Sequence, residues 1–214
     1  KTLTYSGTAI GVGAHTITLT GGGTLTSGGM NLNNAASKLL LNSITLDSAI
    51  ASAESLGVDV DANSTITALT VSNTTPVSIA DGVSLSGAIT VPVAAGSLKL
   101  NEAGTLSSTV AMSGGTLDID ETATVSGALS HSANIKIDVA ANKTLTYSGT
   151  AIGVGANTVT LTGGGTFTSG GITLDNANSK LLLNSITLDG TTTSSDSLGI
   201  DVDANSTVTT LAIG

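Results

Sequence analysis

Apolar and polar residues alternate in short runs that return about every 19 to 22 residues along the chain. Each unit has two apolar residues separated by one residue, and a further apolar residue eight positions after the first. Alternation with a period of two places successive side chains on opposite faces of a β-strand. The regular units are Ile17/Leu19/Leu25, Val58/Val60/Ile66, Val77/Ile79/Leu85, Leu98/Leu100/Leu106, Leu117/Ile119/Val125, Ile137/Val139/Leu145, Val159/Leu161/Phe167 and Ile200/Val202/Val208, and looser units begin at Leu39 and Leu181.

Most units carry another apolar pair a few residues further on, so each unit predicts three short strands. These pairs are Leu69/Val71, Ile89/Val91, Val110/Met112, Ile152/Val154, Ile172/Leu174 and Leu211/Ile213. A unit of about 20 residues is too short to fold alone, but stacked units bury a continuous aliphatic core. The pattern therefore predicts an all-β fold, a parallel β-solenoid of about ten coils with three strands per coil. We expect it to be right-handed, because β-crossover-β connections in parallel sheets nearly always are.

A long repeat overlies the short one. Residues 1–72 match residues 143–214 without a gap, and 53 of the 72 positions are identical. Seven units lie between the start of the first copy and the start of the second, so we expect residues 1–214 to form one continuous solenoid, a segment of a longer repeat protein. Residues 47–57 and 189–199 break the template and differ most between the two copies. This divergence predicts an external loop in each copy.

The stretch GGGTLTSGG at 21–29 returns as GGGTFTSGG at 163–171, with Leu25 replaced by Phe167. We interpret Leu25 and Phe167 as inward residues of a strand and the preceding glycines as a tight bend. Glycine or asparagine, which accept a positive φ, stands five positions after the start of most regular units. These positions are Gly22, Asn63, Gly82, Asn142, Gly164 and Asn205.

The two residues that flank the third apolar position of each unit must point outward, and all of them are threonine or serine. Stacked, they predict two columns of hydroxyl groups, about 4.8 Å apart from coil to coil. Three interpretations stay open: a solvated strand face, an ice-binding ladder, and a contact for a glycan or protein. The threonines proposed for this surface are Thr24, Thr26, Thr65, Thr67, Thr105, Thr124, Thr144, Thr146, Thr166, Thr168, Thr207 and Thr209; Ser84/Ser86, Ser107 and Ser126 complete the regular units, Ser43/Thr45 and Ser185/Thr187 the irregular ones, and Thr2/Thr4 begin the chain.

Composition excludes several classes of partner. The chain has six lysines, no arginine and a net charge of −9, whereas phosphate binding requires clustered basic residues. Nucleic acids and anionic membrane surfaces are therefore not expected partners, and no apolar run is long enough to predict membrane insertion. There is no cysteine for a disulfide or a thiolate metal site. The three aromatic residues, Tyr5, Tyr147 and Phe167, indicate a narrow interior lined by aliphatic side chains.

Candidate chemistry is sparse. Asp118, Asp120 and Asp138 would lie on adjacent coils, where carboxylate oxygens can hold Ca²⁺, but Lys99 and Lys136 are close enough to compensate their charge. We expect solvated aspartates there and no metal or cofactor. A glycosidase would need two carboxylates in a cleft beside sugar-stacking aromatics, so the sequence predicts no enzyme. Of the two histidines, His15 is replaced by Asn157 in the second copy, and His131 stands at the second apolar position of a third strand. We therefore expect His131 to lie at an edge or to line the core, and not to act as a base.

Segments such as GGGTLTSGG (21–29), DGVSLSGAITV (81–91) and ETATVSGALS (121–130) resemble the repetitive β-helical stalks of large bacterial surface proteins of the filamentous haemagglutinin and autotransporter-adhesin kind. The resemblance spans nearly the whole chain and lies in composition and period, so it assigns no residue a role. It implies secretion to the cell surface and a structural or adhesive function. The expected contacts are neighbouring repeats of the same chain, an unidentified surface or cell partner, and end-to-end association.

Overall fold

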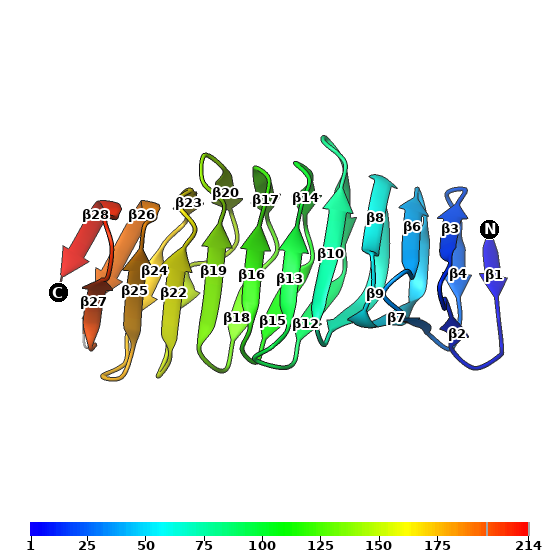
Figure 1. Cartoon of the computed structure of the whole chain (residues 1–214), viewed down its shortest axis with the longest axis horizontal. Coiled ribbons are helices and arrows are strands. Elements are labelled where there is room, and N and C mark those ends of the chain that lie inside the picture. The colour runs from blue at the N-terminus through cyan, green and yellow to red at the C-terminus, as the bar shows by residue number, and fades with distance from the viewer. Residues whose placement is uncertain (196, 214) are drawn as a thin grey trace.

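The computed structural model describes residues 1–195 and 197–213 as a parallel β-solenoid of about ten turns with about three strands per turn. Successive coils stack along one axis, and the two termini lie at opposite ends of the rod (Figure 1). No helix in the described residues is long and apolar enough to span a membrane. The predicted fold class and the predicted stacking are therefore confirmed.

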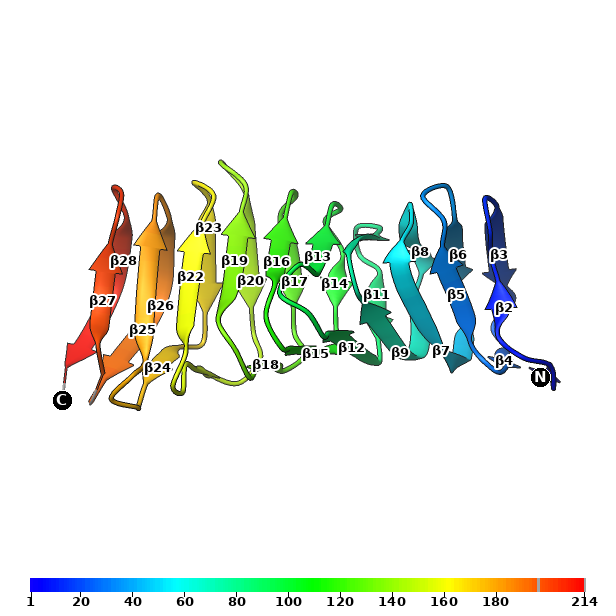
Figure 2. The same cartoon turned by 60° about the horizontal axis from the view of Figure 1, so that its bottom comes forward.

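The first strand of each coil contributes to a ten-stranded parallel sheet. Figure 2 shows its strands side by side along the rod, with the strands of the other sheet behind and beneath them. In stacking order they are β3 (Thr16–Thr20), β6 (Lys38–Asn42), β8 (Gly57–Ala62), β10 (Thr74–Ile79), β13 (Ser97–Leu100), β16 (Thr116–Ile119), β19 (Ile135–Val139), β22 (Thr158–Thr162), β25 (Lys180–Asn184) and β27 (Gly199–Val202).

The other two strands of each coil form an eighteen-stranded sheet that bends around the core. Its middle strands are β1 (Thr2–Thr4), β4 (Thr24–Thr26), β11 (Ser84–Ser86), β14 (Thr105–Leu106), β17 (Ala123–Val125), β20 (Thr144–Tyr147) and β23 (Thr166–Ser169). The third strands are β2 (Ile10–Gly11), β5 (Met30–Asn33), β12 (Ala88–Val91), β15 (Thr109–Met112), β18 (Leu129–His131), β21 (Ile152–Gly153) and β24 (Ile172–Leu174). Longer strands supply both positions in four coils: β7 (Thr45–Glu54), β9 (Ser64–Val71), β26 (Thr187–Ser194) and β28 (Thr207–Ile213).

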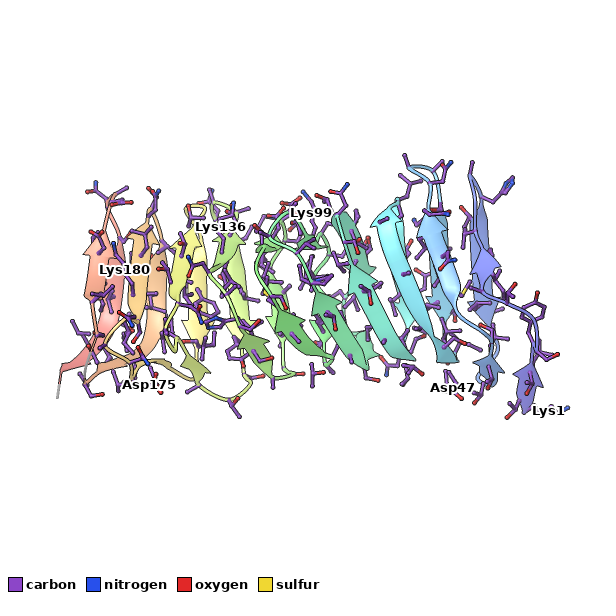
Figure 3. All side chains as sticks on the ribbon, turned by 90° about the horizontal axis from the view of Figure 1, so that it is seen from below. Lys1, Asp47, Lys99, Lys136, Asp175 and Lys180 are labelled. Carbon is purple, nitrogen blue, oxygen red and sulfur yellow. The ribbon has the colours of Figure 1, made fainter. Side chains whose placement is uncertain are left out.

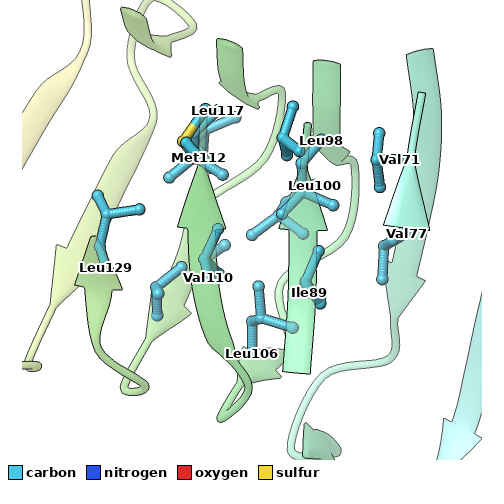
Figure 4. Packing of buried hydrophobic residues seen from close by; sticks show 14 of the residues in the cluster. Val71, Val77, Ile89, Leu98, Leu100, Leu106, Val110, Met112, Leu117 and Leu129 are labelled. Carbon is cyan, nitrogen blue, oxygen red and sulfur yellow. The ribbon is translucent and has the colours of Figure 1, made fainter. Parts of the chain in front are cut away.

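The inward residues form one aliphatic cluster that runs from coil to coil. In Figure 4, Leu98, Leu100 and Leu117 from the ten-stranded sheet meet Ile89 and Val110 from the eighteen-stranded sheet. Inward residues of each coil therefore pack against inward residues of the coils before and after it, which a single coil cannot provide. Leu25 and Phe167 are both inward and buried, as the sequence predicts.

The coils do not stack in one constant register. Equivalent positions of the repeat would place Ser84 beside Thr65 and Leu145 beside Val125. Instead Ser86 lies beside Thr65 and Tyr147 beside Val125, so the pairing of the middle strands is shifted by two residues at each place. The ten-stranded sheet makes the same step where Val77 pairs with Leu100. A step of two preserves the alternation of inward and outward side chains, so the core stays apolar. The constant register assumed from the sequence is wrong at these junctions.

In the described residues, most of the segments 47–57 and 189–199 is strand and not external loop; residue 196 lies outside them. Residues 45–54 and 187–194 are strands β7 and β26, and each strand contains a bulge a few residues after its start. Ile50 and its counterpart Thr192 both point inward and are fully buried. Sequence divergence in this stretch therefore reflects altered core packing as well as surface change.

Thr192 places a hydroxyl in the core, where its Oγ1 is buried and makes no hydrogen bond with any residue that the structure describes. Thr192→Val keeps the shape and removes the unsatisfied group, so we expect it to raise the free energy of unfolding by about 1 to 2 kcal/mol. Urea unfolding followed by circular dichroism measures the change. Thr75→Val is the matched control, since buried Thr75 donates a hydrogen bond to Ser52 Oγ at 2.9 Å. The control should lose about 1 kcal/mol; equal effects in both variants would contradict this account.

Tyr147 occupies the junction between the central coils and the second copy of the long repeat. In the described residues no ladder joins β18 to β21, although both lie at the same position of adjacent coils. Tyr147 fills this place: its side chain is buried, and its hydroxyl accepts the N–H of Leu129 at 3.0 Å. Its ring centroid lies 6.4 Å from that of Phe167. The Tyr147 hydroxyl therefore satisfies one backbone N–H at the place where the two strands do not pair.

Candidate functional site

The hydroxyl face consists of the outward residues of the middle strands. Its positions are Thr2/Thr4, Thr24/Thr26, Thr45/Asp47, Thr65/Thr67, Ser84/Ser86, Thr105/Ser107, Thr124/Ser126, Thr144/Thr146, Thr166/Thr168, Thr187/Asp189 and Thr207/Thr209. None of these side chains is buried, whereas the residue between each pair lies on the core side of its strand. The outward orientation that the sequence predicts for the regular units is confirmed.

Two of the pairs differ from the prediction. Thr24 pairs with Thr45, and Thr26 pairs with Asp47, so the irregular coil contributes Thr45/Asp47 instead of Ser43/Thr45. The second copy likewise contributes Thr187/Asp189 instead of Ser185/Thr187. Ser43 and Ser185 instead form the bend, with φ of 59° and 55°. The corner between the first and the middle strand is one residue shorter in these coils than in the regular coils. Leu46 and Leu188 therefore point into the core from the middle strands, and Ile44 and Ile186 are buried at the corners.

Each copy therefore has an aspartate at the same point of its hydroxyl face. Asp47 accepts hydrogen bonds from Thr67 Oγ1 at 3.2 Å and from Thr26 Oγ1 at 3.4 Å. Asp189 accepts one from Thr209 Oγ1 at 3.2 Å. Sequence reasoning missed both aspartates because two registers of the irregular coil satisfy the apolar pattern. The return of Asp47 as Asp189 in the second copy was the signal that could have drawn attention to them.

The hydroxyl columns are divided into three blocks by the register steps. At the first register step Thr65 Oγ1 lies 2.9 Å from Ser86 Oγ. Thr65 is the first residue of its outward pair and Ser86 the second, so the first column of one block continues into the second column of the next. Thr124 lies beside Thr146 across the second step. The blocks span residues 2–67, 84–126 and 144–209. The face is thus a stepped surface with short regular stretches, and its hydroxyls partly satisfy one another.

The outward side of the ten-stranded sheet and the neighbouring corner carry five lysines, each with an acidic partner on the same or an adjacent coil. Figure 3 shows Lys99, Lys136 and Lys180 spread along the rod. The pairs are Lys38–Asp59 at 2.8 Å, Lys99–Asp120 at 2.6 Å, Lys99–Asp118 at 3.7 Å, Lys136–Asp138 at 3.1 Å, Lys143–Glu121 at 2.5 Å and Lys180–Asp201 at 2.8 Å. Most of these pairs join coils, so they oppose misalignment of neighbouring coils, although ion pairs exposed to solvent contribute little to stability.

Asp118, Asp120 and Asp138, the weak candidates for Ca²⁺, lie together as the sequence predicts. Asp118 pairs with Asp138 on the next coil, and Lys99 contacts both Asp118 and Asp120. Burial raises the pKa of Asp118, although the nearby Lys99 charge opposes this, and the hydrogen bond to Asp120 raises the pKa of Lys99. Among the described residues no group of three or more metal-binding side chains is arranged to hold an ion. The carboxylates are engaged by lysines instead.

The raised pKa of Asp118 predicts a pH-dependent effect. A carboxyl group whose folded pKa exceeds its unfolded value stabilises the fold when protonated, and this stability is lost as the pH rises through the folded pKa. Asp118→Asn should therefore raise the melting temperature at pH 7 and change it little at pH 3, where both states are protonated. Asp61→Asn, at an exposed carboxylate, is the control and should shift neither value. A larger gain at pH 3 than at pH 7 would contradict the proposed cause.

His131 lies at an inward position of the eighteen-stranded sheet, beside Met112 of the preceding coil. Its Nδ1 is 3.1 Å from the carbonyl oxygen of Ala133, and its Nε2 is buried without a partner in the described part of the chain. The ring is therefore held by a backbone carbonyl and not by a carboxylate. His131 is thus half-buried at an inward strand position, in agreement with the expected place at an edge or lining the core, while His15 is exposed.

The chain thus offers two long polar surfaces, a stepped face of hydroxyls and a face of paired charges, built on an unbroken aliphatic core. Comparison of the chain with protein-family models, with curated proteins and with solved structures finds no match.

Proposed function

We propose that this chain is a non-catalytic structural segment of a large bacterial cell-surface protein, in which it acts as a rigid spacer with a long contact surface. The observation that carries the proposal is the continuous core: inward residues of one coil pack on those of the next from Leu25 to Leu188. Parallel coils joined by strand pairing in both sheets resist bending, because a bend would break hydrogen bonds in both sheets at once.

The secreted location is proposed on the resemblance of the repeats to β-helical stalks of surface proteins. Two properties of the sequence are compatible with it. The absence of cysteine avoids unpaired thiols outside the cell, and the excess of acidic residues keeps a long repetitive surface soluble.

Ice binding by the hydroxyl face is the alternative that the sequence raises, and three features count against it. The register steps interrupt the columns, Asp47 and Asp189 place charges within them, and serine occupies four of the six positions of the central block. We therefore expect no ice-recrystallisation inhibition from the protein, and none to be lost in Thr26→Tyr or Thr168→Tyr. Activity that either substitution abolishes would revive the alternative.

The spacer proposal is tested by distances along the rod. Because the chain has no cysteine, spin labels can be placed at Thr4→Cys and Thr209→Cys without further change. Ten coil steps at about 4.8 Å predict a narrow distance distribution near about 48 Å, whereas Thr4→Cys with Thr124→Cys should give about 29 Å over six steps. Broad distributions, or distances that fail to scale with the number of coils, would overturn the rigid-spacer proposal.

A further inference from the structure

His131 is a polar residue in an otherwise apolar column of the core. The inward residues at the end of the third strand are Val71, Val91 and Met112 in the three preceding coils, and His131 follows them on β18. Its imidazole is half-buried, and its Nε2 makes no hydrogen bond with any residue that the structure describes. A buried polar atom without a partner lowers stability. Packing alone therefore does not explain an imidazole at this position.

The hydrogen bond of the other ring nitrogen fixes the chemical form of Nε2. Nδ1 of His131 lies 3.1 Å from the carbonyl oxygen of Ala133. A carbonyl oxygen only accepts, so Nδ1 carries the proton in this bond, and Nε2 of the neutral ring presents a lone pair. Histidines that bind metal ions are held in this way, with one ring N–H donated to a backbone carbonyl or a carboxylate. The ring of His131 is thus oriented as a metal ligand is.

Met112 places a thioether beside this nitrogen. It lies 19 residues before His131 and pairs with it directly between β15 and β18, and its side chain projects into the core (Figure 4). Both residues line an open hollow of about 170 Å³, together with exposed residues such as Ser113 and Ser130, so the hollow reaches the surface. Paired strands lie about 4.8 Å apart, and the three rotatable bonds of methionine let its sulfur turn toward the imidazole.

This pair of ligands selects a soft cation. Thioether sulfur and imidazole nitrogen are ligands of Cu⁺, whereas Ca²⁺ and Mg²⁺ take oxygen. Bonds of about 2.1 Å to nitrogen and about 2.3 Å to sulfur, the lengths found for zinc, would place the two ligand atoms about 4.4 Å apart on opposite sides of an ion. That separation is close to the spacing of the strands that carry them. The chain also has no cysteine, whose thiolate would compete for such an ion.

We propose that Met112 and His131 form a binding site for a soft monovalent cation of the Cu⁺ and Ag⁺ class, with Met112 Sδ and His131 Nε2 as its ligands. The ion would give Nε2 the partner that it lacks and would link two adjacent coils. This link would lie where β18 does not pair with β21 among the described residues. The site is separate from the aspartates and lysines of the ten-stranded sheet, and the inference does not rest on the spacer function.

Titration with Ag⁺ in a chloride-free buffer tests the site, because Ag⁺ shares the ligand preference of Cu⁺ and is not oxidised in air. Calorimetry should give one tightly bound Ag⁺ per chain, and Ag⁺ should raise the melting temperature, since a ligand of the folded state stabilises it. Met112→Leu and His131→Leu should each weaken binding by at least about tenfold and abolish the rise in melting temperature. Met112→Leu nearly conserves side-chain volume, so it should remain folded.

The other methionine and the other histidine of the chain supply matched controls. Met30 is a buried methionine of a third strand, but its paired neighbours on β2 and β7 are isoleucines. His15 is exposed, and the second copy of the repeat has asparagine at its position. Met30→Leu and His15→Asn should therefore leave both the affinity for Ag⁺ and the stoichiometry unchanged.

Three outcomes would overturn the proposal: no tight binding of Ag⁺ by the unmodified protein, full binding retained in Met112→Leu, and a loss of binding in Met30→Leu or His15→Asn as large as that in Met112→Leu. Circular dichroism of each variant establishes that it is folded. If His131→Leu does not fold, the comparison of Met112→Leu with Met30→Leu decides, because the two substitutions are chemically identical and differ only in the neighbouring imidazole.

Discussion

Tyr147→Ala should lower the free energy of unfolding by about 4 kcal/mol, the range found when a buried aromatic side chain is truncated. The ring fills the core where β18 and β21 do not pair in the described residues, and its removal also leaves the N–H of Leu129 without the acceptor that it now has. Both losses fall at one junction between coils. Urea unfolding followed by circular dichroism gives the change, and hydrogen exchange should rise first around residues 123–153.

The long repeat supplies a matched control for this variant. Tyr5 is the same residue at the same position of the first copy, but it is 47% exposed, so Tyr5→Ala should cost less than about 1 kcal/mol. Tyr147→Phe keeps the ring and loses only the acceptor, and it should cost about 1 kcal/mol. If Tyr5→Ala and Tyr147→Ala were equally destabilising, the role assigned to the junction would be wrong.

Gly87→Ala should cost about 3 kcal/mol or more, because the backbone there cannot accept a side chain. Gly87 has φ of 136° and stands opposite Ile66, where the middle strands step by two residues. A Cβ atom would lie 2.1 Å from the carbonyl oxygen of Ile66. Backbone strain at such a φ costs about 1 to 3 kcal/mol by itself, and the contact with a backbone atom adds to it. The melting temperature and the urea midpoint should both fall.

Substitutions at two other glycines distinguish the cost of backbone strain from the cost of a steric contact at Cβ. Gly82 has φ of 73° with open space around its Cβ position, so Gly82→Ala should cost about 1 kcal/mol from backbone strain. Gly153 also has open space and no positive φ, and Gly153→Ala should be neutral or slightly stabilising. A loss in Gly87→Ala no larger than that in Gly82→Ala would show that the register step does not need glycine.

The orientation of side chains could be predicted from the sequence because it depends on local alternation alone. Residues such as Leu25, Leu106 and Phe167 face inward, and the threonines beside them face outward, whichever coil they contact. The register between coils could not be predicted, since a shift of two residues keeps every side chain on its own face. The strand pairing in the structure shows where the shifts occur, as at Gly87, Tyr147 and Val77.

The outward residues of the irregular coils were predicted wrongly for a related reason. Ile44 and Leu46 both satisfy the apolar pattern, and the choice between them decides whether Ser43 or Asp47 joins the hydroxyl face. The positive φ of Ser43, which fixes the bend one residue earlier, has no distinct sequence signal. Divergence between the copies at residues 47–57 was interpreted as exposure, although Thr192 shows that a buried position had changed.

The central claim is that the chain is a rigid rod whose length is set by the number of its coils. Residues 73–214 appended after Gly214 continue the sequence in phase, because Gly214 corresponds to Ser72 in the long repeat. The addition supplies seven coils, so small-angle scattering should show a maximum dimension greater by about 34 Å with an unchanged cross-section. A smaller increase with a thicker cross-section, or scattering from two bodies joined flexibly, would contradict the account.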